Sequence, residues 1–207
     1  MSRRIGLFGG TFDPPHVGHL ALAEWARDSL RLDRVLFVPA GFPPHKRRAR
    51  LSGVEHRVAM TRLAVRHNPA FTVSALEARR DGPSFTVDTL RALRRRFLRA
   101  RLFLLMGADS LDEFPTWRDP ETILALATLV VASRPGGRAV AGEGRVAEAR
   151  VRRLARGARI AWLRNPGLEV SSSAIRALLR SGRTARYLVP DGVARYAARH
   201  RLYRGRG

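Results

Sequence analysis

Residues 9 to 19, with the sequence GGTFDPPHVGH, combine residue types that suit a phosphate-binding turn. An apolar run precedes two glycines, two prolines restrict the chain after them, and His16 and His19 follow where a helical pattern begins. Small residues let a phosphate approach the backbone, and the free N–H groups and dipole at a helix N-terminus favour negative charge. Residues three apart share one helix face, so both imidazoles can point at the same ligand.

Other patterns of catalytic residues are missing from the sequence. It contains no cysteine, which excludes disulfides, thiolate catalysis and cysteine-ligated metals. No P-loop motif occurs, no G-x-G-x-x-G follows the first apolar run, and no nucleophile elbow is present. No cluster of side chains has the spacing of a metal site, so no metal is expected to be held by protein side chains alone.

Ser171 to Ser173 predict a second anion site, because they open another helix. Arg176 lies one turn further along and can donate to a phosphate with its forked guanidinium. The alternative is that Ser172 and Ser173 only cap the helix, although capping and phosphate contact can coexist. Among the 39 basic residues Lys46 is the one lysine, which favours a phosphate contact where a guanidinium does not fit.

Apolar runs alternate with helical patterns along the whole chain, and these elements must position the candidate residues. Strands are predicted at residues 3–8, 34–38, 71–74, 102–106, 129–132 and 160–163. Helices, with their caps, are predicted at residues 18–31, 52–68, 84–99, 119–127, 143–156, 171–182 and 191–200. Ser52 with Glu55 fits a capping box for the second helix, and Asp119 with Pro120 fits the start of the fourth.

This alternation predicts an α/β fold: a Rossmann-like, doubly wound, mainly parallel sheet with helices on both faces and a small C-terminal helical part. We expect one domain over residues 1–207, with about 165–207 as a helical subdomain. Ligands of such folds lie outside the carboxyl ends of the strands. The loops at 9–19, 43–46, 107–109 and 134–136 all follow predicted strands and should share one edge.

The formal net charge of +22 raises the possibility of a basic nucleic-acid-binding module. The arginines are spread from Arg3 to Arg206 rather than gathered in one stripe, which favours compositional bias and an anionic small-molecule substrate. No apolar run of about 18 residues occurs, so no membrane span is expected. The N-terminus lacks the pattern of a signal peptide, and a cytoplasmic location is the simplest expectation.

The first motif resembles the signature of the nucleotidyltransferase superfamily that carries H-x-G-H, and the chain is similar to the bacterial nicotinate mononucleotide adenylyltransferases within it. Further matches run along nearly the full chain: PPHK at 43–46, SFTVDTL at 84–90, GADSL at 107–111, Trp117, RPG at 134–136, VSSSAIR at 170–176 and RYLVP at 186–190. Ser173 stands where the family usually has threonine, and it keeps the hydroxyl. Residues 136–150 match nothing recognisable.

The resemblance implies that the 5′-phosphate of nicotinate mononucleotide attacks the α-phosphorus of ATP, with pyrophosphate leaving and Mg²⁺ held mainly by the ATP phosphates and water. Catalysis would then be alignment and charge stabilisation, carried by His16, His19, Lys46 and Arg176. The residues implied to bind ATP are Gly9, Gly10, Thr11, Phe12, His16, His19, Ser172, Ser173 and Arg176.

The resemblance places nicotinate mononucleotide against Lys46, Thr86, Asp109, Trp117 and Arg134. Thr86 would meet the nicotinate carboxylate, Asp109 a ribose hydroxyl, and Trp117 the pyridine ring. Asp109 as a simple helix cap and Trp117 as a lid over the core are the structural alternatives. Another member of the superfamily, such as a pantetheine-phosphate adenylyltransferase or a cytidylyltransferase, is the rival enzyme, and the oligomeric state is not indicated.

Overall fold

The computed structural model describes residues 2–42, 51–132, 143–164 and 167–204. Within these ranges one sheet contains six strands in the order β3-β2-β1-β4-β5-β6, and every neighbouring pair is parallel. The strands are β1 (Arg4–Gly10), β2 (Arg34–Pro39), β3 (Phe71–Val73), β4 (Arg101–Gly107), β5 (Ala127–Ala132) and β6 (Ile160–Leu163). This is the strand order of a doubly wound sheet whose order reverses between β1 and β4, as the sequence predicts.

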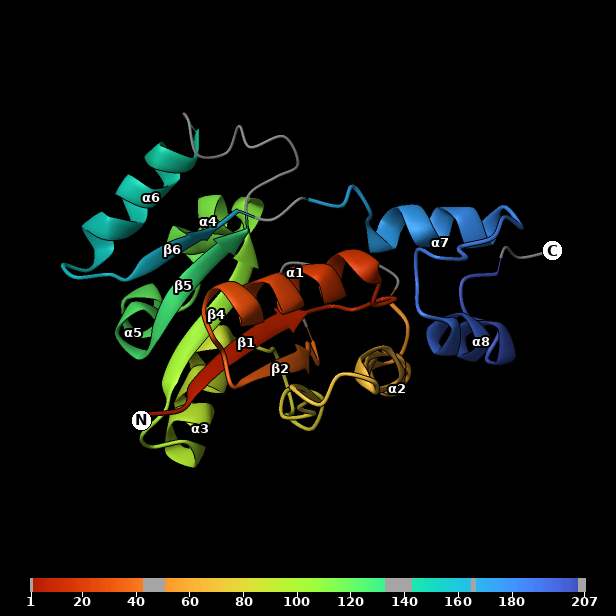
Figure 1. Cartoon of the computed structure of the whole chain (residues 1–207), viewed down its shortest axis with the longest axis horizontal. Coiled ribbons are helices and arrows are strands. Elements are labelled where there is room, and N and C mark those ends of the chain that lie inside the picture. The colour runs from red at the N-terminus through yellow and green to blue at the C-terminus, as the bar shows by residue number, and fades with distance from the viewer. Residues whose placement is uncertain (1, 43–50, 133–142, 165–166, 205–207) are drawn as a thin grey trace.

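Helices cover both faces of the sheet (Figure 1). They are α1 (Val17–Ser29), α2 (Val54–Val65), α3 (Thr86–Arg96), α4 (Ala108–Glu113), α5 (Pro120–Leu126), α6 (Glu143–Leu154), α7 (Ser172–Arg180) and α8 (Asp191–Arg199), with a 3₁₀ turn at Phe114–Thr116. Successive strand side chains point to opposite faces. Leu104 of β4 therefore joins a cluster with α3, α5 and α6, while the next residue, Leu105, joins the cluster under α1.

Two predicted details differ from the structure. The segment after β4 forms α4 and a 3₁₀ turn, where the sequence predicts only the end of a strand and a loop. The predicted Ser52–Glu55 capping box is wrong, because α2 begins after Gly53 with no side-chain cap. The backbone N–H of Ser52 instead donates to a carboxylate oxygen of Asp13 at 3.1 Å. The predicted Asp119 cap is confirmed, since its side chain accepts from the N–H of Thr122.

The C-terminal helices α7 and α8 lie together at one end of the molecule, beyond the carboxyl end of β1 and far from α6 (Figure 1). They share a separate apolar cluster with α2, made by Met60, Ile175, Ala185, Val189, Val193 and Ala197. Apolar burial of this kind is the main term that holds helices together. The last helices are therefore fastened to the sheet domain through α2 and through the polar contacts at the site described below.

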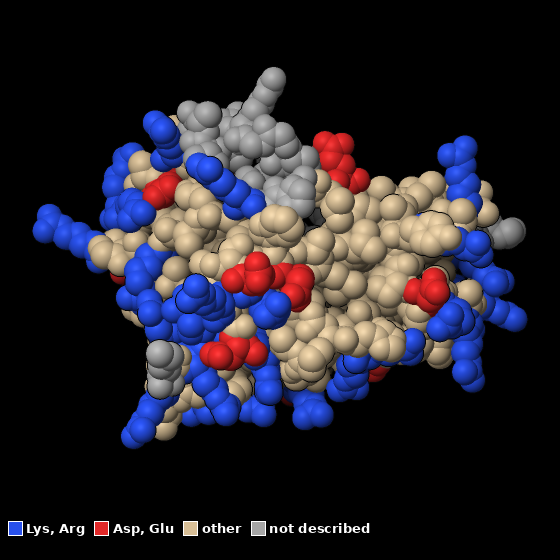
Figure 2. All heavy atoms as spheres, in the orientation of Figure 1, with Lys and Arg blue, Asp and Glu red and all other residues tan. Residues whose placement is uncertain are grey.

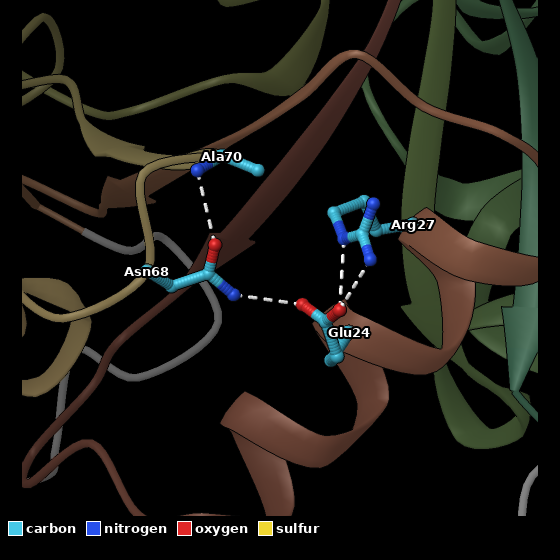
Figure 3. Close-up of polar contacts among 4 residues, drawn as sticks. All are labelled: Glu24, Arg27, Asn68 and Ala70. Carbon is cyan, nitrogen blue, oxygen red and sulfur yellow. Dashed lines mark hydrogen bonds and ion pairs between the residues drawn. The ribbon is translucent and has the colours of Figure 1, made fainter.

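A polar network fixes α1 to the edge of the sheet (Figure 3). The carboxylate of Glu24 accepts two bonds from the guanidinium of Arg27, at 2.8 and 2.6 Å, and one from the side-chain amide of Asn68 at 2.7 Å. The amide oxygen of Asn68 accepts from the N–H of Ala70, directly before β3. The bond from Arg27 is the largest cause that lowers the pKa of Glu24. Because α1 carries the histidine motif at its start, this network helps to set the position of the site.

In the part of the chain that the structure describes, none of the helices is long and apolar enough to cross a bilayer.

Candidate active site

Residues 9–19, here called the glycine–histidine turn, connect β1 to α1 at the switch point of the sheet. The turn passes close to the start of α7: a Cβ atom at Gly18 would lie 2.8 Å from a methyl carbon of Val170 and 3.1 Å from Nδ1 of His16. The backbone N–H of Val17 donates to the carbonyl of Leu188 at 3.0 Å. The sequence stretches around 170 and 188 therefore meet the first motif in space.

His16 and His19 lie on one side of the α1 N-terminus, with their rings stacked at a centroid distance of 3.7 Å. His16 is the N-cap residue, and its backbone N–H donates to Nδ1 of His19 at 3.2 Å. A neutral imidazole that accepts at Nδ1 carries its proton on Nε2, so His19 is fixed as a donor through Nε2. The ring of His19 also packs edge-on against Phe12, at 5.0 Å between centroids.

The His16 side chain is 6% exposed, and burial lowers its pKa from 6.5 to about 4. Burial does this because the charged imidazolium loses its hydration. Nδ1 of His16 is buried and has no hydrogen-bond partner among the described residues. His16 is thus a neutral group near pH 7.

We expect an NMR titration of the His16 ring to give a midpoint near pH 4 in the free protein. The unfolded chain takes up this proton near pH 6.5, so it binds more protons than the folded chain between these two values. Stability should therefore fall as the pH is lowered through this window. Urea unfolding at about pH 7 and about pH 5 measures that loss, and a His16→Ala variant should show a shallower slope. A midpoint near 6.5 would contradict the burial of this ring.

Two polar contacts join the glycine–histidine turn to α7. Nη1 of Arg176 donates to the backbone carbonyl of Asp13 at 2.7 Å, and the hydroxyl of Ser172 donates to the carbonyl of Pro14 at 2.9 Å. The helix is capped by Ser171, whose hydroxyl accepts from the N–H of Ala174. The predicted second helix N-terminus is therefore real and lies against the first, which gives two positively polarised helix ends at one place.

Arg176 and Ser173 also contact each other, since Nη2 of Arg176 donates to the Ser173 hydroxyl at 3.1 Å. In this structure the guanidinium of Arg176 therefore has two protein partners, one in the turn and one on its own helix. A guanidinium has five N–H donors, so a ligand phosphate can still be met by the others.

Arg57 of α2 connects the glycine–histidine turn to the loop after β2, and the sequence analysis did not single it out. Its side chain is 2% exposed, and burial lowers its pKa. The guanidinium donates at 2.6 to 3.0 Å to the backbone carbonyls of Thr11, Ala40, Gly41 and Ser52. A signal for it existed, because Arg57 stands four and eight residues before Thr61 and Val65, on the buried face of the helix.

A second group of contacts fixes the loop after β2 against the start of α3. The hydroxyl of Ser84 accepts from the backbone N–H groups of Gly41 and Phe42, at 3.0 and 3.2 Å. Position 41 has no room for a Cβ atom, which would overlap the carbonyl oxygen of Glu77. Thr86, the first residue of α3, follows directly, so its N–H and hydroxyl lie at a helix N-terminus as predicted.

The buried carboxylate of Glu77 supports this helix start. Its Oε1 accepts from the hydroxyl of Thr89 at 2.6 Å. Burial raises the pKa of Glu77, while the bond from Thr89 opposes that change. The contact holds the first turn of α3 to the segment that precedes it.

Trp117 lies half-buried after the 3₁₀ turn, and its ring packs on Phe114 at 5.4 Å between centroids. Its indole Nε1 is buried and has no partner among the residues that the structure describes. The neighbouring Arg118 lies over the ring of Phe85, at 4.7 Å, next to Thr86. The segment at 117 and the start of α3 are therefore brought together.

Asp109 is exposed in the first turn of α4, directly after β4 and thus beside the end of β1. Lys46 and Arg134 lie outside the described residues, at 43–50 and 133–142. The structure therefore brings together the turn, the α7 start, the α3 start and the segment at 117 along the carboxyl edge of the sheet. The positions of Lys46 and Arg134 stay predictions.

The chain is similar to proteins of one family along nearly its whole length. The model of the cytidylyltransferase-like family matches residues 7–178. The chain is 47% identical over 201 residues to a probable nicotinate-nucleotide adenylyltransferase of Thermomicrobium roseum, covering 97% of this chain and 92% of that protein. It is 46% identical over 203 residues to the protein of the same name from Roseiflexus, covering 98% and 99%.

A solved structure has the same fold at low sequence identity. The Plasmodium falciparum nicotinic acid mononucleotide adenylyltransferase complexed with NaAD superimposes with a TM-score of 0.78, at 16% identity and with 97% of each chain covered.

Proposed function

Because this chain belongs to the cytidylyltransferase-like family, and within it to the nicotinate-nucleotide adenylyltransferases, we propose that it transfers the AMP group of ATP to nicotinate mononucleotide. The products are nicotinate adenine dinucleotide and pyrophosphate, in the biosynthesis of NAD. The observation that carries the proposal is the meeting of two helix N-termini at the glycine–histidine turn, which suits a triphosphate. Residues 1–207 would act as one catalytic domain, with 165–207 as its helical subdomain, in the cytoplasm.

In this reaction an oxygen of the 5′-phosphate of nicotinate mononucleotide forms a bond to the α-phosphorus of ATP. The bond from that phosphorus to the oxygen bridging to the β-phosphate breaks, and pyrophosphate leaves with the electron pair. The protein contributes alignment and charge stabilisation rather than a covalent intermediate. We assign the donors on the α-phosphate to His16 and His19, because both rings lie at the switch point and neither has to give up a proton.

The triphosphate is assigned to the backbone of Gly9, Gly10 and Phe12, the hydroxyl of Thr11, and the α7 group of Ser172, Ser173 and Arg176. Arg176 then binds a phosphate in addition to Asp13 and Ser173, through the N–H donors that these two bonds leave over. The nicotinate carboxylate is assigned to Thr86, the pyridine ring to Trp117, and a ribose hydroxyl to Asp109. Lys46 is assigned to a phosphate because it is the one lysine of the chain and because of the resemblance, and Arg134 is assigned to nicotinate mononucleotide on the resemblance alone.

Mg²⁺ is proposed as the metal that accompanies ATP. Among the described residues no group of three or more His, Asp or Glu side chains could hold an ion. Mg²⁺ does not require such a group, because it usually keeps several waters and is bound largely by substrate phosphates. When bound, the ion would neutralise charge on the phosphate oxygens, and the described side chains act on the same oxygens as hydrogen-bond donors.

The nucleic-acid alternative is disfavoured by the charge distribution. Figure 2 shows arginine side chains at both ends and along the lower border of one face, with a band of other residues between them. A nucleic-acid interface is typically a continuous basic patch or stripe.

A pyrophosphate-release assay tests the proposed function. With ATP and Mg²⁺ we expect release with nicotinate mononucleotide, and little or none with 4′-phosphopantetheine. Nicotinamide mononucleotide serves as the matched probe, because it differs only in the group assigned to Thr86. Its carboxamide keeps one oxygen for Thr86 but lacks the second oxygen and the negative charge, so we expect less release than with nicotinate mononucleotide. Absence of release with nicotinate mononucleotide would refute the proposal.

A further inference from the structure

The carboxylate of Asp13, in the middle of the glycine–histidine turn, is enclosed by protein. Asp13 is 1% exposed, so each carboxylate oxygen needs a partner inside the structure. One oxygen accepts from the backbone N–H of Ser52 at 3.1 Å, before α2. The other accepts from the phenol hydroxyl of Tyr203, at 2.5 Å. A bond this short between a hydroxyl and a carboxylate is in the range of strong, charge-assisted hydrogen bonds.

Tyr203 comes from a part of the chain far from the turn. It stands 190 residues after Asp13, beyond the end of α8. Its hydroxyl also lies 3.7 Å from the sulfur of Met60, and its ring packs against the apolar cluster that α2 shares with α7 and α8. Burial raises the pKa of Tyr203 above its usual value, which keeps the phenol protonated and able to donate throughout the neutral pH range.

The backbone on both sides of the Asp13 carboxylate is already held by α7. Arg176 donates to the carbonyl of Asp13 and Ser172 to that of Pro14. The side chain of Asp13 fixes the turn in the direction of α2 and α8, in addition to the bond from Arg57 of α2 to the carbonyl of Thr11. His16 follows three residues later, so a shift of Asp13 moves the imidazoles relative to the triphosphate.

We propose that Tyr203 is a positioning residue, whose hydroxyl holds the Asp13 carboxylate so that the turn presents His16 and His19 to the triphosphate. This inference rests on the proposed function. Among the described residues the hydroxyl of Tyr203 contacts Asp13, Ser52 and Met60, none of which is assigned to ATP or to nicotinate mononucleotide, so the hydroxyl acts through Asp13. The C-terminal segment is thereby part of the site that forms at the other end of the chain.

Tyr203→Phe removes the hydroxyl and keeps the ring. We expect kcat for pyrophosphate release to fall by roughly tenfold or more, because misplacement of reacting groups by a fraction of an ångström to one ångström costs rates of this size. The KM for nicotinate mononucleotide should stay within about twofold, since its assigned pocket is built from α3 and the segment at 117. A purely structural role would lower the melting temperature and leave kcat of the folded enzyme unchanged.

The other two tyrosines supply matched controls. Tyr187 is 83% exposed, and Tyr196 is half-buried on the side of α8 that faces α2, where its hydroxyl is hydrogen-bonded to Nδ1 of His56. Tyr187→Phe and Tyr196→Phe should keep kcat within about twofold of the unmodified enzyme. If the unmodified enzyme and these controls release no pyrophosphate, the proposed function fails. If they do so and Tyr203→Phe matches them in kcat, the positioning role fails.

A second variant covers the case in which Tyr203→Phe does not fold, since it leaves a buried carboxylate oxygen without a partner. In an Asp13→Ala background both the buried charge and the acceptor for the hydroxyl are gone. If the hydroxyl acts through the carboxylate, adding Tyr203→Phe to Asp13→Ala should leave kcat within about twofold of the single Asp13→Ala enzyme. A further loss of about tenfold in this background would show that Tyr203 acts elsewhere and would overturn the inference.

Discussion

His19→Ala is expected to lower kcat by about a hundredfold or more while the protein stays folded. Removal of one preorganised donor to a developing oxyanion typically costs this much. The structure fixes which nitrogen donates: Nδ1 of His19 accepts from the N–H of His16 at 3.2 Å, so the proton is on Nε2. The fold loses one backbone partner at the helix start, which costs on the order of 1 kcal/mol. Steady-state pyrophosphate release with circular dichroism of the same sample measures both.

Two further substitutions of His19 distinguish the role of its Nδ1 from the role of its Nε2. The amide N–H of His19→Gln can take the place of Nε2, and the amide oxygen of His19→Asn can take the place of Nδ1. We expect the glutamine variant to retain more activity and the asparagine variant to retain more stability. His67→Ala is the control, because His67 is exposed and contacts Arg66. A His19→Ala enzyme with nearly unchanged kcat would remove His19 from the site.

Arg57→Met is expected to lower the free energy of unfolding by about 3 kcal/mol or more. The substitution leaves four backbone carbonyls around the site without the donor that now reaches them at 2.6 to 3.0 Å. Each buried acceptor that loses its partner costs about 1 to 3 kcal/mol, and few small domains have more than about 15 kcal/mol in total. Urea unfolding followed by circular dichroism measures the loss.

Arg62→Met is the matched control on the same helix, because Arg62 is exposed and a surface substitution of this kind changes stability by only about 0.5 kcal/mol. Arg57→Lys should be intermediate, since a single ammonium keeps the charge but cannot reach carbonyls on both sides of the loop. Equal stability of Arg57→Met and Arg62→Met would show that the carbonyls find other donors.

The fold was predictable because its signals are local. Each strand of the sheet is an apolar run in the sequence. A helical pattern lies between successive runs, which predicts that the strands pair in parallel. The sheet with the order β3-β2-β1-β4-β5-β6 confirms this prediction. The short helix α4 was missed because six residues give too few repeats for a periodic pattern. The predicted Ser52–Glu55 capping box is wrong for a different reason. The backbone N–H of Ser52 donates to the carboxylate of Asp13, which lies 39 residues away in sequence. Local cap signals cannot include such a competing contact.

The site was predictable where residue types are unusual and spacing is fixed, as at His16 and His19. It was not predictable where one common residue acts through distant contacts. Arg57 is one of many arginines in this chain, and only its place on a buried helix face distinguishes it. Tyr203 belongs to no motif, and its partner Asp13 is remote in sequence. The assignments of Lys46 and Arg134 stay predictions, since both lie outside the described residues.

The bond between Asp13 and Tyr203 also has a consequence for the order of events during protein synthesis. The glycine–histidine turn is translated 190 residues before Tyr203, the residue that fixes its carboxylate. At roughly 5 to 20 residues per second this delay is about 10 to 40 seconds. A nascent chain should therefore lack the bond that holds its first motif until Tyr203 has left the ribosome.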